Sequence, residues 1–293
     1  MPELPEVETT KNDLKETILG HKIVGIDVLW PGIIKNVPIK VFSKAVEGTR
    51  INQIERRAKN LIIKLSNNLT LLIHLKMTGH LLVGDKTSSA DRVGYWKPGS
   101  KETFLDPQNQ FIRIIFYLND NLILAMSDLR KFGYIKLLEE RELQEFLSQY
   151  GPEPFSKDFQ LSYLEKVFSR KRQPIKKVLI DQTVIAGIGN IYADEILWAS
   201  QIHPKRTAES LKKSEIKSIL EQTTKILNLA IQSRGTSTSD FRDTSGKKGS
   251  FGNMLSVYRR TGLPCPVCGG PIRRIVLGGR GTHFCSACQK EIE

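Results

Sequence analysis

The chain has few cysteines and no long apolar run, and each absence excludes a class of protein. Its four cysteines all lie beyond residue 264, whereas a disulfide scaffold would spread them along a smaller secreted chain. No apolar run approaches the roughly 20 residues that a membrane-spanning helix needs. The first residues, MPELPE, are acidic and interrupted by proline, so they lack the basic start and the apolar stretch of a signal peptide. We therefore expect a cytoplasmic protein with reduced thiols.

Acidic residues are scarce relative to basic ones. The 293 residues include 44 Lys and Arg against 31 Asp and Glu, a formal charge of +13. A surplus of this size favours a polyanionic partner, because each neutralised phosphate of a nucleic acid releases a condensed counterion. The surplus does not identify the polyanion, and a soluble protein with a basic surface would give the same count. The length predicts two domains, or one domain and a small module.

Predicted strands dominate the first part of the chain. Residues typical of strands are enriched, between polar turns, in the segments 22–30, 60–65, 70–75, 111–118, 122–126 and 133–138. One helix, over about residues 5–18, precedes them, with Glu6 and Glu8 in its first turn. Many strands after a single helix predict a sandwich or a barrel. The polar segment 83–109 is predicted to be a long surface loop.

The second half is predicted to be helical, which makes the fold class α+β. Helical patterns cover 160–169, 174–181, 191–201 and about 213–232. The sequence GPEP at 151–154 separates the halves, and residues 233–254 are rich in Ser, Thr, Gly, Asp and Lys, which predicts a mobile loop. We therefore predict a β-rich domain over 1–140, a linker over 141–158, a helical domain over 159–254 and a small module over 255–293.

Four cysteines in two pairs predict that this last module binds zinc. Two residues separate Cys265 from Cys268, sixteen follow, and two separate Cys285 from Cys288. Two such pairs can supply four thiolates to a tetrahedral ion, and the spacer suits a zinc-ribbon hairpin. Redox-active cysteine pairs are the alternative. Because four protein ligands would close the site, we expect one structural zinc ion, which stabilises a tail too small to fold alone.

The N-terminus offers a candidate nucleophile. An initiator Met1 before a small residue is normally removed, which would leave Pro2 as a terminal secondary amine. An α-amino group titrates near pH ~8, so part of it is neutral and nucleophilic at physiological pH. Such an amine can attack an anomeric carbon and form an iminium adduct, and Glu3 beside it could act as a general acid. By composition alone the same residues could be an ordinary capped helix start.

Seven motifs in order resemble one known family across nearly the whole chain. They are PELPEVET (2–9), RRAK (56–59), HLKMTG (74–79), DLRKFG (128–133), GPEP (151–154), GIGNIYA (187–193), and the cysteine hairpin with GRGT (279–282). The sequence is similar to the formamidopyrimidine-DNA glycosylases, which are bifunctional glycosylases and abasic-site lyases. The resemblance implies a β-sandwich-like first domain, a helix-two-turn-helix second domain and a zinc-finger β-hairpin.

The resemblance also implies catalytic roles. Pro2 resembles the family's nucleophile at C1′ and Glu3 its proton donor. Lys59 resembles the strand lysine that assists β-elimination, although alone it would be read as a strand-edge charge. Arg280, on the hairpin, resembles the residue tied to δ-elimination, which holds a phosphate beside the lesion.

Further residues resemble the family's DNA contacts: Met77, Arg130, Phe132, Lys171, Asn190 and Tyr258. The first three resemble the trio that fills the gap left by an extruded base. Base extrusion needs an apolar wedge and a hydrogen-bonding group, although Met77 and Phe132 taken singly would be core residues. Lys171 resembles a phosphate-binding lysine, and we expect Asn190 to cap the next helix, whose N-terminal amides can bind a phosphate.

The chain departs from the family's pattern in places. Phe111 stands where the family often has a DNA-contacting histidine, and either Arg113 replaces its charge or the contact is absent. The segment 83–109 is longer than usual, and Asn60 stands where an aromatic residue is common.

The sequence therefore predicts a monomeric enzyme that excises oxidised purines from damaged double-stranded DNA. One alternative is an endonuclease VIII-like relative specific for oxidised pyrimidines, although Leu4 stands where that branch usually has glycine. A non-catalytic zinc-containing DNA-binding protein would not need Pro2, Glu3 and Lys59 together. An RNA-binding zinc-ribbon protein of the translation machinery fits the charge but not the N-terminus.

Overall fold

The computed structural model describes residues 1–85, 106–237 and 240–291. It divides into two compact units. The first unit comprises Met1–Ser148 and Ser233–Gly252, and the second comprises Gln149–Gln232 and Asn253–Glu293. Most of the predicted loop 83–109, and two positions of the segment 233–254, lie outside the described residues.

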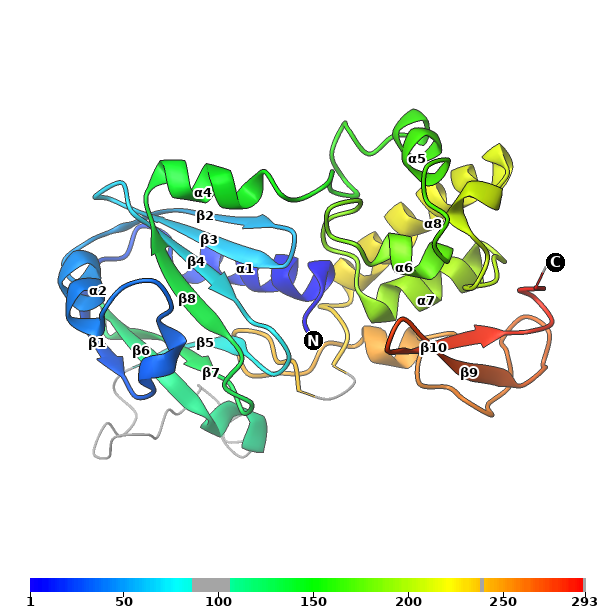
Figure 1. Ribbon diagram of the computed structural model, residues 1–293. Helices are drawn as coiled ribbons and strands as arrows, with labels where there is room; N and C mark the ends of the chain where they lie inside the picture. Colours follow the sequence, from blue (N-terminus) through cyan, green and yellow to red (C-terminus); the bar gives the residue numbers. More distant parts are fainter. Residues whose placement is uncertain (86–105, 238–239, 292–293) are drawn as a thin grey trace. The chain divides into compact units, whose positions relative to one another are not determined.

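Two four-stranded antiparallel sheets build the first unit (Figure 1). One sheet has the order β1 (Ile23–Val28), β6 (Ile112–Leu118), β7 (Leu122–Ser127) and β5 (His80–Asp85), and the other β2 (Ile51–Arg57), β3 (Asn60–Leu65), β4 (Thr70–His74) and β8 (Tyr134–Leu138). Along β6, buried residues alternate with half-buried ones, as expected of a strand with one face on a core. The predicted sandwich-like, β-rich domain is therefore confirmed.

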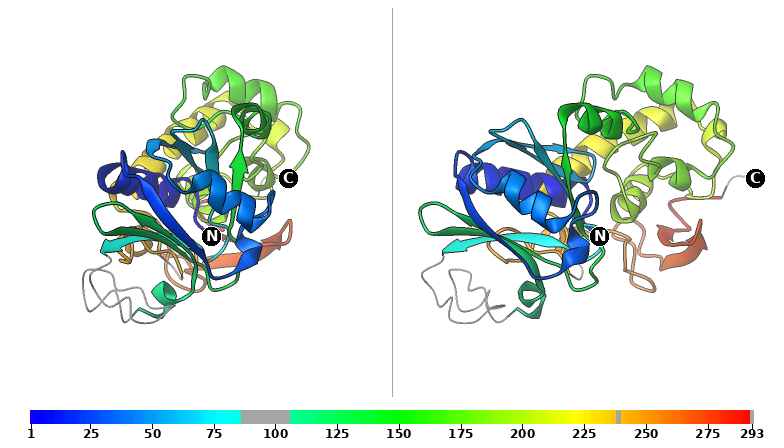
Figure 2. Two further views of the ribbon diagram at one scale, coloured as in Figure 1. Left: turned by 90° about the vertical axis from the view of Figure 1, so that its left-hand side faces the viewer. Right: turned by 60° about the vertical axis from the view of Figure 1, so that its left-hand side comes forward.

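Helix α1 (Leu4–Ile18) packs against both sheets of this unit. It contacts β2 and β5, which are edge strands of different sheets, and places Val7, Leu14 and Ile18 in the core that the sheets share. At the other edge of the sheet that contains β2, the 3-10 helix η1 (Pro31–Ile33) contacts β8. Figure 2 shows the two sheets from two further directions. The N-terminal residues are thus held at the start of a helix that is packed along its length.

Several elements of the first unit were not expected from the sequence. Helix α2 (Ile39–Val46) buries Phe42, whose ring centroid lies 6.3 Å from that of Phe116. Helix α4 (Glu140–Leu147) begins with a Glu139–Glu142 capping box and buries Leu143 against β3 and β4 residues. It occupies the first part of the segment 141–158 that we predicted to be a linker. Its single buried leucine gives too weak a helical period to recognise in sequence.

The segment 233–252 packs with the first unit, although the sequence analysis grouped it with the helical domain. Three contacts join it to distant residues of the first unit: the Val83 N–H donates to the Thr244 carbonyl (2.8 Å), Asn109 Nδ2 donates to the Gly246 carbonyl (3.2 Å), and Arg242 pairs with Asp106 (2.6 Å). Such long-range backbone and ionic contacts leave no periodic signal in sequence. The short 3-10 helix η2 (Pro107–Gln110) contains Asn109, and the 3-10 helix η4 (Phe251–Met254) begins where the segment ends.

The second unit is helical and ends in a hairpin. Its elements are α5 (Leu161–Phe168), α6 (Ile175–Leu179), α7 (Asn190–Ala199), η3 (Ala208–Ser210), α8 (Lys213–Gln232), β9 (Ile272–Leu277) and β10 (Arg280–Cys285). Helix α7 packs against both α8 and β10. The predicted helical domain with a terminal hairpin is confirmed. Within the described ranges, no helix is long and apolar enough to cross a membrane.

Candidate catalytic and DNA-binding site

The N-terminal residues are fixed by a reciprocal hydrogen-bond pattern at the head of α1. Glu3 is the N-cap, and its side chain accepts from the backbone of Glu6 while the Glu3 N–H donates to Glu6 Oε2 at 2.7 Å. This capping box satisfies amides that the first helical turn would otherwise leave without partners. Pro2 is buried and the Glu3 side chain is almost fully buried. The structure therefore buries the Pro2 nitrogen, which is an amide until Met1 is removed, next in the chain to a buried carboxyl group.

Lys59 lies in the tight turn between β2 and β3, where Ala58 adopts a positive φ of 55°. It is only 6% exposed, which is unusual for a lysine and excludes a simple solvated charge at a strand edge. Burial, together with the charges of Lys76 and Lys59, lowers the pKa of His74 to about 3. Its neutral ring accepts the Lys76 N–H at Nδ1 (3.0 Å). The buried lysine of this turn therefore lies near a neutral histidine at the end of β4.

Two exposed loops of the first unit present the trio Met77, Arg130 and Phe132. Met77 is 38% exposed and Phe132 is 50% exposed, so neither is the core residue that its type alone suggests. The Arg130 guanidinium lies 4.6 Å from the centre of the Phe132 ring, a cation–π distance. Apolar surface and a hydrogen-bonding cation are therefore presented together by neighbouring loops.

One buried carboxylate joins these two loops. Asp128 accepts a very short hydrogen bond from the Thr78 hydroxyl, and its other oxygen accepts the Gly133 N–H at 2.7 Å. The Thr78 hydroxyl oxygen in turn accepts the Arg130 N–H at 3.0 Å. Thr78 and Asp128 belong to motifs of the family resemblance, but no pattern in the sequence indicates that they pair. Their contact fixes the spacing of Met77 and Arg130.

Phe111 and Arg113, where the family pattern is broken, lie close together. The Arg113 guanidinium is 5.9 Å from the Phe111 ring, and its Nε donates to the carbonyl oxygen of Asp128 at 2.8 Å. Arg113 therefore supports the same loop as Asp128.

In the second unit, Lys171 precedes α6 in the chain and Asn190 follows it. Lys171 Nζ is 3.9 Å from a carboxylate oxygen of Asp181, and the side chain is 36% exposed, so it can reach a phosphate. The expectation that Asn190 caps α7 is wrong, because Gly189 is the N-cap and Asn190 is the first helical residue. The Asn190 amide instead donates to the Gly281 carbonyl at 2.9 Å, beside Arg280 in the hairpin.

A buried ion pair connects the helices of the second unit to the hairpin. Lys176 and Asp194 form a very short contact, and both are essentially without exposure. Asp194 also accepts the backbone N–H of His283 (2.9 Å) and lies 3.0 Å from its Nδ1. Arg280 begins β10 after a turn in which Gly278 and Gly279 have positive φ, and it is exposed. The ion pair thus anchors the strand that presents Arg280.

A buried carboxylate holds the backbone of Tyr258 and of the two residues before it. The buried Glu195 carboxylate accepts the N–H groups of Ser256, Val257 and Tyr258 at 2.8–3.0 Å. Burial raises the pKa of Glu195, and the three N–H donors oppose that shift. The Tyr258 ring meets the His283 ring edge to face, with centroids 5.0 Å apart.

The four cysteines converge on one point. Their sulfur atoms all lie within 4.8 Å of one another, with Cys268 and Cys285 at 3.4 Å and Cys265 and Cys288 at 3.9 Å. Sulfurs at corners of a tetrahedron with a Zn–S distance of about 2.3 Å are separated by about 3.8 Å. The donor set therefore fits zinc, and its four protein ligands make the site structural. Two separate redox pairs would not need this convergence.

Comparison with known proteins identifies the family. Residues 1–135 match the formamidopyrimidine-DNA glycosylase N-terminal domain, residues 150–242 its H2TH domain, and residues 262–290 the zinc finger found in FPG and IleRS. The formamidopyrimidine-DNA glycosylases of Streptococcus mutans and Herpetosiphon aurantiacus are each 39% identical, over 99% of this chain and 100% of theirs. The chain belongs to the formamidopyrimidine-DNA glycosylase family. It is accordingly an enzyme of the DNA glycosylase class with a structural zinc site.

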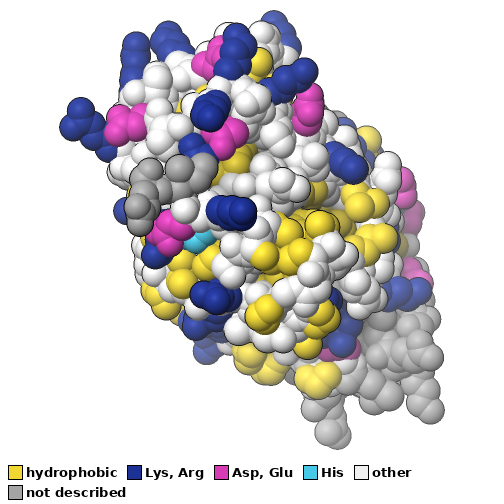
Figure 3. All heavy atoms as spheres, turned by 90° about the vertical axis from the view of Figure 1, so that its right-hand side faces the viewer, with side chains coloured by type: hydrophobic (Ala, Val, Ile, Leu, Met, Phe, Trp, Pro, Cys, Tyr) yellow, Lys and Arg dark blue, Asp and Glu magenta, His cyan; other side chains and the backbone are white. Residues whose placement is uncertain are grey.

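Solved structures of this family share the fold. Lactococcus lactis Fpg, in complex with DNA containing an abasic site, is 32% identical with a TM-score of 0.86. MutM, in complex with DNA containing carbocyclic 8-oxo-G, is 32% identical with a TM-score of 0.85. Each alignment covers 99% of this chain and 100% of the other. One face of this chain carries Lys and Arg side chains among apolar ones, with fewer Asp and Glu (Figure 3).

Proposed function

We propose that this enzyme excises oxidised purines, 8-oxoguanine and formamidopyrimidines, from duplex DNA and then cleaves the resulting abasic site. Its relatives' complexes with an abasic site, Fapy-dG and carbocyclic 8-oxo-G support this substrate class. The observation that carries the proposal is the fixed position of Pro2 and Glu3 at the head of α1.

The proposed reaction begins after removal of Met1. The Pro2 nitrogen attacks C1′ of the extruded nucleotide, and the bond to the base breaks as Glu3 supplies a proton to the opening sugar. The secondary amine gives an iminium that stays charged. This charge acidifies C2′, so that loss of a C2′ proton expels the 3′ phosphate, with Lys59 assisting. A second elimination expels the 5′ phosphate, which Arg280 is proposed to hold, and water then releases the sugar fragment.

The remaining predicted residues are proposed to bind DNA. Met77, Arg130 and Phe132 would occupy the gap left by the extruded base, and their exposure supports this role. Lys171, Asn190 and Tyr258 are proposed to contact the backbone around the lesion. We also propose that the enzyme acts as a monomer.

Borohydride trapping tests the proposal. Purified enzyme shown to lack Met1 and to hold zinc is incubated with duplexes containing 8-oxoguanine opposite cytosine, or thymine glycol. We expect a covalent adduct with the first duplex, mapped to Pro2. Trapping only with thymine glycol would move the enzyme to the oxidised-pyrimidine branch, and no adduct with either would remove the catalytic assignment.

Substitution of the nucleophile provides the second test. Pro2→Gly should lose excision but keep much of its DNA binding, because a primary amine gives an imine that must first be protonated. Pro5→Ala is the matched control, since Pro5 lies in the first turn of α1, three residues after Pro2, and carries no free amine. Normal excision by Pro2→Gly would refute the assignment of Pro2.

A further inference from the structure

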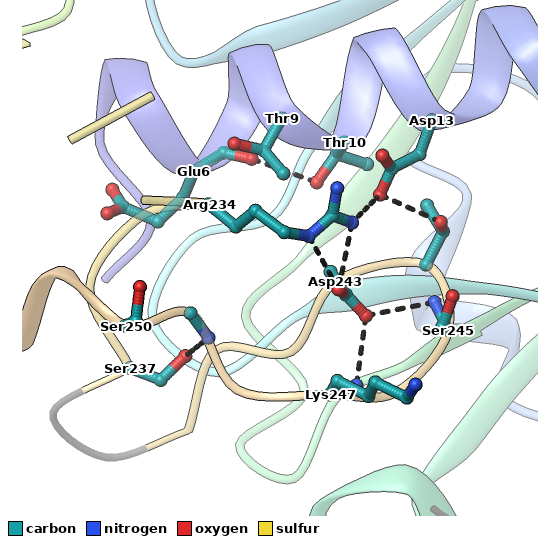
Figure 4. Close-up of polar contacts among 12 residues, drawn as sticks. Glu6, Thr9, Thr10, Asp13, Arg234, Ser237, Asp243, Ser245, Lys247 and Ser250 are labelled. Carbon is teal, nitrogen blue, oxygen red and sulfur yellow. Dashed lines mark hydrogen bonds and ion pairs between the residues drawn. The ribbon is translucent and has the colours of Figure 1, made fainter. Parts of the chain in front are cut away.

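The segment 233–252 lies along one face of α1 and makes three hydrogen bonds to its Glu6 and Asp13 side chains (Figure 4). One of them runs from the Thr244 hydroxyl to Asp13 Oδ2 at 2.9 Å. Glu6 Oε1 accepts the Thr236 N–H at 2.6 Å, and Asp13 Oδ2 accepts Arg234 Nη2 at 2.6 Å. Glu6 and Asp13 are seven residues apart, so they share one helical face two turns apart. Glycine is required at position 235, between the two contacts, because its φ is +79° and a Cβ there would lie 2.9 Å from the Glu6 carboxylate oxygen.

Arg234 is the central contact of this arrangement. Its guanidinium joins Asp13 to Asp243, whose Oδ2 lies 2.8 Å from Nη2 and 3.0 Å from Nε. Asp243 is 4% exposed and its other oxygen accepts the N–H groups of Ser245 and Lys247. One arginine therefore links the helix to a carboxylate that organises the segment.

The backbone at Arg234 shows that this contact is maintained against a local cost. Arg234 has φ +58°, in the left-handed region that favours glycine, only two residues after α8 ends. A side chain in this region costs roughly 1 kcal/mol relative to glycine. The two ion pairs offset that cost and explain an arginine at a position where glycine is the easier residue.

The contact reaches the N-terminus through Glu6. The Glu6 side chain is buried, and its second oxygen accepts the Glu3 N–H in the capping box. If the segment moves away, Oε1 loses the Thr236 N–H in a buried setting, which allows the carboxylate to reorient. Reorientation would release the Glu3 backbone next to Pro2.

We propose that Arg234 is a positioning residue for the Pro2 amine, because it holds the segment 233–252 on α1 and thereby keeps Glu6 fixed against the Glu3 backbone. The role rests on the proposed function of Pro2. Arg234 touches neither substrate nor the reacting atoms, and it acts through Thr236 and Glu6.

The test uses Arg234→Gly in the full-length, zinc-loaded enzyme. Glycine accepts the positive φ without strain, so this variant removes the ion pairs without stressing the backbone. We expect single-turnover borohydride trapping on a duplex with a preformed abasic site to slow about tenfold, a modest factor because Arg234 is half exposed. Amide hydrogen exchange at Thr236 and Glu3 should accelerate, while exchange at Leu14 in the middle of α1 stays unchanged. Arg234→Lys, which keeps the charge, should restore part of the rate.

Gln201→Gly is the matched control. Gln201 follows α7 with φ +57° and is exposed, so glycine relieves the same backbone strain without touching α1. It should trap at the wild-type rate. Asp13→Asn tests the same contact from the helix side and should slow trapping without altering the backbone at residue 234.

The outcomes separate the two proposals. Faster exchange at Thr236 with trapping within twofold of wild type would overturn the positioning role, and unchanged exchange would overturn the contact itself. Equal acceleration at Leu14 would show general destabilisation and also overturn it. If the wild-type enzyme forms no adduct, the function of Pro2 fails, while hydrogen exchange still decides whether Arg234 holds the segment.

Discussion

Replacing Thr78 with valine should separate the two loops that present Met77 and Arg130. Valine has nearly the shape of threonine but no hydroxyl. The substitution removes the hydrogen bond to the buried Asp128 and the acceptor of the Arg130 N–H. A hydrogen bond to a charged group contributes roughly 1.5–3 kcal/mol and a neutral one roughly 1 kcal/mol. We therefore expect Thr78→Val to lower the free energy of unfolding by about 2–4 kcal/mol.

The functional effect should exceed the effect on DNA affinity. Met77 and Arg130 are proposed to enter the gap left by the base, so a change in their spacing slows base extrusion while phosphate contacts remain. We expect single-turnover excision at saturating duplex to fall roughly tenfold, which corresponds to about 1.4 kcal/mol. Urea unfolding and excision of 8-oxoguanine are the two measurements, and Thr78→Ser, which keeps the hydroxyl, should recover most of both.

A matched substitution is available in α8. The Thr223 hydroxyl is buried and has no hydrogen-bond partner within the part of the chain that the structure describes. Thr223→Val should therefore leave stability unchanged or raise it, because it removes an unsatisfied polar group. If Thr78→Val unfolds at the same urea concentration as wild type and excises at the same rate, Asp128 and Thr78 do not couple the loops.

Three further outcomes follow from the structure. Cys268→Ser should abolish zinc binding, measured by atomic absorption, and weaken binding to lesion-containing duplex at fixed salt; unchanged affinity in the metal-free variant would show that the hairpin is not needed. Trp198 Nε1 donates a hydrogen bond to Cys265 Sγ at 3.4 Å. Trp198→Phe should therefore release zinc to a chelator roughly tenfold faster, and an unchanged rate would show that this hydrogen bond does not stabilise the zinc site. Burial lowers the pKa of His80 from 6.5 to about 4, so the unfolded chain binds a proton that the folded chain excludes. Stability is then complete above pH 6.5 and falls by about 3 kcal/mol toward pH 4, and His80→Gln should flatten this dependence in urea unfolding.

The sequence predicted elements with strong local patterns and missed those stabilised by distant contacts. The strand 60–65 and the helix 213–232 were predicted at their observed bounds because their apolar residues repeat clearly. Strand β2 has only two buried residues, Ile51 and Ile54, in seven, so only pairing with β3 makes it a strand. The position of the segment 233–252 depends on ion pairs such as that of Arg242 with Asp106, which are 136 residues apart.

The site shows the same division. The cysteine spacing alone predicted the metal site, because coordination imposes a local spacing that sequence displays. The roles of Glu6, Asp128 and Asp194 were not predicted. Each joins polar groups from separate segments of the chain. A single carboxylate in a sequence does not indicate which distant donors it accepts.

The exposure of the first-unit site residues also distinguishes them, independently of the family resemblance. Glu3, Glu6 and Lys59 are charged yet at most 6% exposed, whereas Met77 and Phe132 are apolar yet at least 38% exposed. Both placements oppose the usual partition of residue types and carry a free-energy cost. Folding alone would favour the opposite arrangement, and violations of local rules are expected at functional sites. The buried charged residues lie at the N-terminus and in the turn that are proposed for catalysis. The exposed apolar side chains lie on the loops that are proposed to enter DNA. The unfavourable placements therefore coincide with the residues proposed for catalysis and for DNA binding.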